Sequence, residues 1–154
     1  MNEHYEFCER CVAQAVSLLK DLQHAHPPTE LDIRRRRRAG SIALRGLYDT
    51  LRQAFLTPID REDLWQLCLL SERVLFAAEE TGFRQQPFDP RMLTACTQLR
   101  QAVAAFPNFR RDETAFEQVA KLQVTLSDAC ISNGLTDACG RLADALLFAA
   151  LKNE

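Results

Sequence analysis

Hydrophobic residues recur along the chain at intervals of three and four positions, with polar residues between them. This spacing gathers the hydrophobic side chains on one face of an α-helix, whereas a half-buried strand would alternate at every second residue. Leu, Ala, Arg, Glu and Gln, which favour helices, dominate the long periodic segments, and the chain has only five glycines. The pattern therefore predicts an all-α protein.

Helix stop and start signals divide this pattern into six segments. Proline lacks a backbone donor and disfavours helical geometry in the residue before it, whereas Asp and Thr cap the start of a helix. The predicted helices span residues 4–25, 30–55, 61–82 and 90–106, a fifth segment that starts between 108 and 112, and a last segment that ends near 152. Because short turns join them, we predict an antiparallel up-and-down bundle of six helices, with two three-helix layers side by side as one arrangement.

Glycines mark two of the predicted helix ends. Gly82, after Thr81, is expected to end the third helix, and Gly134, after Asn133, is expected to supply a left-handed stop for the fifth. Gly40 and Gly46 lie inside the second helix, where each costs about 1 kcal/mol relative to Ala. We expect them to mark close packing or a local irregularity.

Length and composition favour one domain that covers residues 1–154, because 47% hydrophobic content in 154 residues suffices for one core. The net charge of −2 excludes a strongly basic protein, so nucleic-acid or membrane binding would need a local patch. The first residues lack the basic and apolar regions of a signal peptide, and no run is long enough to span a membrane. We predict a cytoplasmic protein whose six cysteines are buried free thiols.

The ten residues Phe55 to Leu64, FLTPIDREDL, combine a helix stop with a helix start. Pro58 ends the second helix, and Asp60 caps the third, whose first turn carries acids that suit the helix dipole. The hinge residues are Thr57, Pro58, Asp60, Arg61, Glu62 and Asp63. We predict a structural role for them, in which the two flanking helices fold back on each other.

These ten residues resemble the signature of the PhoU-like phosphate-transport regulators, in which an F-(I/L)-T-P-(F/I)-D-R-E-D-(I/L) turn joins two long helices. The order of the helices also fits along most of the chain, although the chain is shorter than typical members. The resemblance implies a cytoplasmic, all-helical protein without established catalytic activity that associates with Pit-type phosphate transporters. It would reach the membrane peripherally, through such a partner.

The resemblance also raises the question of metal binding, because PhoU proteins carry Glu/Asp-x-x-x-Asp motifs that bind iron or zinc clusters. Glu72 stands in the expected region, but Arg73 and Phe76 stand where relatives tend to have acids. We therefore predict no metal site and no cofactor, with a metal-cluster-binding bundle as the alternative.

Two other patterns are weak metal candidates. Glu113 and Glu117 lie one helical turn apart, without His or Cys nearby in the sequence. Cys8 and Cys11, followed by His24 and His26, mimic a zinc arrangement, but the His-x-His spacing is poor for a Cys2His2 site. Neither pattern changes the prediction.

A run of five arginines is the strongest charge anomaly, and it comprises Arg34, Arg35, Arg36, Arg37 and Arg38. Successive helical residues lie about 100° apart, so the five cannot share one face. The run is either a solvated, partly ion-paired segment or a surface that docks on an acidic protein, anionic lipid or polyanion. Nucleic acid is not expected, because no aromatic platform accompanies the run.

No Ser/His/Asp or Cys/His nucleophile pattern and no phosphate-binding glycine loop is present, so we predict that the protein is not an enzyme. The preferred interpretation is a regulator or accessory protein that binds a transporter or another protein partner. A metal-cluster-binding bundle and a polyanion-binding module remain alternatives, and a homo-oligomer stays open.

Overall fold

A computed structural model of the chain describes residues 2–24, 27–54, 60–84, 89–106, 113–128 and 134–152. These residues form six α-helices and no strand, which confirms the predicted all-α class and the number of helices. In chain order the helices are α1 (Asn2–Gln23), α2 (Glu30–Gln53), α3 (Arg61–Phe83), α4 (Arg91–Ala105), α5 (Glu113–Asp128) and α6 (Gly134–Lys152).

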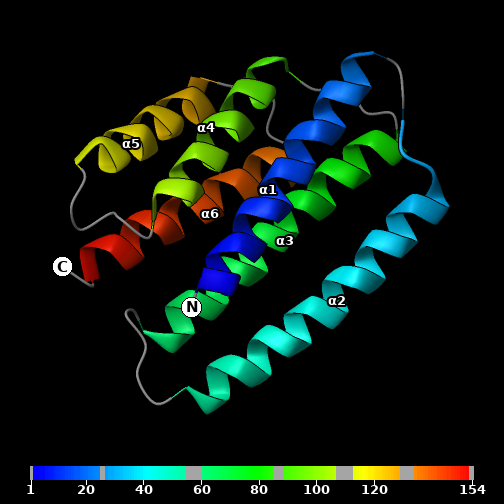
Figure 1. Cartoon of the computed structure of the whole chain (residues 1–154). Coiled ribbons are helices and arrows are strands. Elements are labelled where there is room, and N and C mark those ends of the chain that lie inside the picture. The colour runs from blue at the N-terminus through cyan, green and yellow to red at the C-terminus, as the bar shows by residue number, and fades with distance from the viewer. Residues whose placement is uncertain are drawn as a thin grey trace.

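Four helices form the centre of the molecule. Helix α1 packs against α3 and α4, and α6 packs against the same two helices. Helix α2 covers the side formed by α3 and α1, while α5 packs on α4 and α6. Figure 1 shows α2 and α5 as outer helices on opposite sides of this centre. The described fold thus has a four-helix centre of α1, α3, α4 and α6, flanked by α2 and α5.

The central helices supply most of the hydrophobic core, which includes the fully buried side chains of Leu19, Leu64, Leu99 and Leu142. All five described cysteines are buried free thiols, as predicted, whereas Cys130 lies outside the described residues. Two pairs of cysteines are in contact across neighbouring helices. The Sγ atoms of Cys8 and Cys68 are 3.8 Å apart, and those of Cys96 and Cys139 are 3.6 Å apart.

Helix α2 runs in the direction opposite to α3. Tyr48 of α2 lies edge-on to Trp65, near the start of α3, whereas Arg37 approaches Glu79, near its end. This arrangement is the hairpin expected for helices joined by a sharp hinge. The antiparallel order of the whole bundle and its PhoU-like identity remain predictions.

Neither glycine expected to stop a helix lies after one, because α3 runs one residue past Gly82 and α6 begins at Gly134. Thr81 and Gly82 both lie within α3, which continues to Phe83. A Cβ atom at Gly82 would lie 2.8 Å from Cδ of Pro28, so this glycine permits the close approach of the segment before α2. Gly134 is the first residue of α6 and not a left-handed stop. Asn133 lies outside the described residues.

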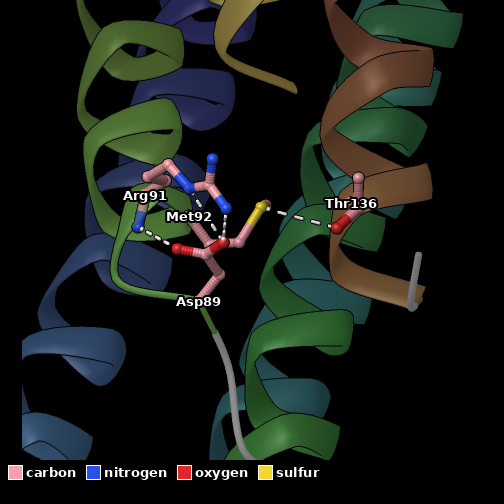
Figure 2. A network of polar contacts seen from close by, with 4 residues as sticks. All are labelled: Asp89, Arg91, Met92 and Thr136. Carbon is pink, nitrogen blue, oxygen red and sulfur yellow. Dashed lines mark hydrogen bonds and ion pairs between the residues drawn. The ribbon is translucent and has the colours of Figure 1, made fainter. Parts of the chain in front are cut away.

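The start of α4 is held by side-chain contacts that tie it to α6. Oδ1 of Asp89 accepts a hydrogen bond from the backbone N–H of Arg91 at 2.9 Å, and Oδ2 accepts one from Nε of Arg91, also at 2.9 Å. Next to them, Oγ1 of Thr136 donates to Sδ of Met92 at 3.4 Å (Figure 2). Helix α4 begins at Arg91, one residue later than predicted, and the predicted cap Asp89 holds its first turn.

The hinge is described from Asp60 onward, while Thr57 and Pro58 lie outside the described residues. Asp60 is the N-cap of α3, and its Oδ1 accepts a hydrogen bond from the backbone N–H of Glu62 at 2.8 Å. Glu62 and Asp63 occupy the first turn, where their charge suits the positive end of the helix dipole. The guanidinium of Arg61 donates to the backbone oxygen of Ala54, so it bridges the end of α2 and the start of α3.

The cap at Asp60 provides a test of this local structure. Asp60→Ala should lower the free energy of unfolding by about 1 kcal/mol, because the N–H of Glu62 loses its acceptor. Asp60→Asn keeps an acceptor oxygen and should lose less. Urea denaturation monitored by circular dichroism measures both values. Equal stability of the alanine variant and the unaltered chain would contradict the capping role.

Candidate functional site: helix α2 and its charged seam

Helix α2 is held to the rest of the protein by a thin apolar seam. Only four of its 24 residues are buried, namely Ile33, Leu44, Leu47 and Leu51. Its start is well formed, since Oγ1 of Thr29 accepts a hydrogen bond from the backbone N–H of Asp32 at 3.2 Å. Charged groups occupy much of the remaining contact with α3.

The arginine run divides between two sides of α2. Arg36 and Arg37 turn toward α3, where the Nε atom of each lies 4.0 Å from an oxygen of Glu79. Arg34 pairs with Glu30 of the same helix at 2.6 Å, on the surface. Arg35 and Arg38 are exposed and form no ion pair within the described part of the chain. The five guanidiniums are therefore not a single patch.

Arg36 and Arg37 of α2 and Glu79 of α3 form a charged seam between the two helices, and Glu79 is its buried end. Its side chain has an exposed fraction of 0%, and neither carboxylate oxygen has a hydrogen-bond partner among the described residues. Burial raises the pKa of the Glu79 carboxyl above its ordinary value, although Arg36 and Arg37 act to lower it. Because the net shift of this pKa is upward, the two guanidiniums compensate only part of the desolvation of the carboxylate.

Glu72 lies two turns earlier on the same helix, opposite Gly40 of α2. Its Oε2 atom is buried without a hydrogen-bond partner, and a Cβ atom at Gly40 would lie 3.1 Å from that oxygen. Burial raises the pKa of the Glu72 carboxyl, with Arg37 acting in the opposite direction. The expectation of close packing is therefore confirmed at Gly40, but not at Gly46, where a Cβ atom would meet no described atom within 4 Å. Arg37 also lies over the ring of Phe76, 4.7 Å from its centroid.

The position of Glu79 in the sequence predicts its burial, although a charged residue is ordinarily expected at the surface. Glu79 follows Leu75 by four residues and so falls on the apolar face of α3. A carboxylate on that face requires a partner from another element, and only the structure shows that α2 brings Arg36 and Arg37 there.

The outer side of α2 carries a stripe of exposed residues that the sequence analysis missed. They repeat at alternating intervals of four and three positions: Leu31, Arg35, Arg38, Ile42, Arg45, Asp49 and Arg52. We call this set the outer stripe. Its four guanidiniums form no ion pair within the described ranges, and Asp49 is its only carboxylate. Leu31 and Ile42 are 57% and 67% exposed, so the stripe presents two large apolar side chains among its charges.

The metal candidates do not converge in the described structure. His24 directly follows α1 and lies about 24 Å along the helix from Cys8, at 1.5 Å per residue, while His26 lies outside the described residues. Glu117 is exposed, and the side chain of Glu113 is not described. No group of three or more His, Cys, Asp or Glu residues in the described structure is placed to hold a metal ion.

Comparisons of the chain with protein-family models, with curated proteins and with solved structures found no match. Among the described helices, none has the length and apolar character needed to cross a membrane.

The raised pKa values of Glu72 and Glu79 give the stability of the protein a definite pH dependence. The folded state holds these protons more tightly than the unfolded chain, whose carboxyls titrate near 4.5. Their contribution to stability is therefore fully present below pH 4.5 and is lost as the pH rises through the folded-state pKa values.

We expect Glu79→Gln to raise the free energy of unfolding at pH 8 by on the order of 1 kcal/mol, because the raised pKa of the Glu79 carboxyl means that its ionisation at this pH opposes folding, and the neutral amide avoids that cost. The gain should shrink as the pH falls toward 5. Denaturant titrations at the two pH values measure both differences.

The matched control is Glu80→Gln, since Glu80 is half exposed and pairs with Arg84 on the surface. This variant should change stability little at either pH. A loss of stability in Glu79→Gln that is the same at pH 5 and pH 8 would show that the ionised Glu79 contributes favourably, contrary to this account.

Proposed function

We propose that the protein is a non-enzymatic regulator or accessory protein that binds an acidic helix of a protein partner through the outer stripe of α2. The observation that carries this proposal is the stripe itself, which presents two exposed apolar side chains and four guanidiniums that form no ion pair with any described residue, along one side of one helix.

The chemistry of the stripe favours a carboxylate-rich surface. Guanidinium groups bind carboxylates through paired hydrogen bonds, which gives both orientation and specificity. Leu31 and Ile42 add apolar contact between the charged groups. From Leu31 to Arg52 the stripe is about 32 Å long, at 1.5 Å per residue.

The spacing of the stripe favours a helical partner. Intervals of four and three residues are those by which one helix packs along another over several turns. A second copy of the same stripe is a poor partner, since it would place guanidiniums opposite guanidiniums. The stripe therefore supports a partner of opposite charge over self-association through this face.

Lipid and nucleic acid fit the stripe less well than a protein does. Helices that lie in a membrane surface bury a broad apolar face, whereas this stripe offers two apolar side chains. Proteins that bind single-stranded nucleic acid stack its bases on exposed aromatic side chains. Tyr48, the aromatic residue of α2, already packs on Trp65.

The resemblance of Phe55 to Leu64 to the PhoU-like signature suggests which partner to test first. We propose that the acidic helix belongs to the cytoplasmic side of a Pit-type phosphate transporter, so that the protein would be peripherally associated with the membrane. The metal-cluster alternative receives no support from the described residues, because no suitable ligand group converges there.

Site-specific crosslinking in the native cell tests this proposal. A photoreactive amino acid at Ile42 should crosslink to a Pit-type transporter, whereas the same group at Phe148, which is equally exposed on α6, should not. The triple variant Arg35→Glu, Arg38→Glu, Arg45→Glu should abolish the Ile42 crosslink.

A control triple variant, Arg73→Glu, Arg100→Glu, Arg141→Glu, changes the net charge equally on exposed residues outside the stripe and should keep the crosslink. Crosslinks from Ile42 that go to nucleic acid or lipid, or that survive reversal of the stripe, would contradict the proposal.

A further inference from the structure

A cavity lies beneath α2, between this helix, α1 and α3, and it is separate from the outer stripe. Its volume is about 110 Å³. An engineered protein cavity of about 150 Å³ is large enough to bind benzene. The space beneath α2 can therefore hold a molecule of a few non-hydrogen atoms.

The cavity wall has an apolar part and a charged part. Phe7 and Leu75 supply apolar surface from α1 and α3. Glu72 contributes a carboxylate from α3, while Arg10 of α1 and Arg36 of α2 contribute guanidiniums. A cavity with both signs of charge excludes a simple apolar ligand, because the charged groups would lose water without gaining partners.

These opposite charges are not paired with one another. Oε2 of Glu72 is buried and has no hydrogen-bond partner among the described residues. The ion-pair contact of Arg36 is with Glu79, at the long distance of 4.0 Å, and its Nε donates to the backbone oxygen of Asp32 at 3.5 Å. The cavity thus offers an acceptor oxygen without a partner among the described residues and a guanidinium whose printed contacts are long.

Gly40 makes room for this arrangement. It lines the cavity, and a Cβ atom there would lie 3.1 Å from Oε2 of Glu72. A glycine in a helix interior lowers stability by about 1 kcal/mol relative to Ala, so its presence here fits a need for space beside the carboxylate.

From this geometry we infer that the cavity binds a small zwitterion of the α-amino-acid class. The ammonium group would donate to Glu72, the carboxylate would accept from Arg36 with Arg10 at the rim, and a short aliphatic side chain would lie against Phe7 and Leu75. A free anion would meet the carboxylate of Glu72, and a free cation would meet the guanidiniums, so each is bound less well. This site is independent of the proposed partner.

Titration of the full chain with L-alanine, followed by two-dimensional ¹H–¹⁵N NMR, tests the site. Saturable shifts are expected at the backbone amides of Gly40, Ala43 and Leu75, which line the cavity. Propionate lacks the ammonium group and ethylamine lacks the carboxylate, and each should bind about tenfold more weakly or worse, since one charge-assisted set of hydrogen bonds is missing.

Two variants connect the binding to the charged wall. Glu72→Gln and Arg10→Gln should each weaken L-alanine binding, the first by about tenfold or more. Arg10 is exposed, so Arg10→Gln is expected to fold and to test the site independently of Glu72→Gln, which changes a buried oxygen. Glu80→Gln, on the same helix but outside this cavity, should leave binding unchanged.

Three outcomes would overturn the inference. The first is the absence of any saturable shift up to about 20 mM L-alanine, which would mean that the cavity holds only water. The second is equal binding of propionate or ethylamine. The third is unchanged L-alanine binding by both Glu72→Gln and Arg10→Gln.

Discussion

The carboxylate of Glu79 is the constraint on which the placement of α2 depends, because it is buried without a hydrogen bond to any described residue and two guanidiniums face it at 4.0 Å. Helix α2 has only four buried residues, so hydrophobic burial alone holds it less firmly than it holds α1 or α3. The charged seam fixes which side of α2 faces the core. The guanidiniums compensate the buried charge of Glu79 only in part, since desolvation has the larger effect on the pKa of its carboxyl.

Helical geometry connects the charged seam with the outer stripe. Because adjacent residues are about 100° apart, Arg36 and Arg37 can reach Glu79 only if Arg35 and Arg38 point elsewhere. These two then join Arg45 and Arg52 on the outer side of the helix. One run of arginines thus serves two purposes: part of it attaches α2, and part of it forms the stripe proposed to bind a partner.

Much of the fold could be read from the sequence. The interval of three and four residues gave the helices, and Asp60 and Thr29 gave two of their starts, because these signals are local. The two misassigned glycines show the limit of local signals. Gly82 fits the rule for a helix end equally well, but its neighbour Pro28 is distant in sequence, and only the packing of the segment before α2 explains why a glycine is needed.

The candidate sites were harder to predict from the sequence for the same reason. Glu79 and Glu72 become unusual only when α2 covers them, and Gly40 acquires its meaning from an oxygen 32 residues away. The outer stripe was readable in principle from its seven-residue repeat. The contiguous run of five arginines obscured it, because three of those five residues lie outside the repeat.

The central claim is that α2 is an outer helix attached weakly, by four buried side chains and a charged seam that is only partly compensated, and native-state hydrogen exchange tests it most directly. The account predicts that the amides of α2 exchange through a separate opening, with a lower free energy than those of α1, α3 and α6. If the core amides of α2 exchanged only with global unfolding, at the same free energy as those of α3, the claim would be contradicted.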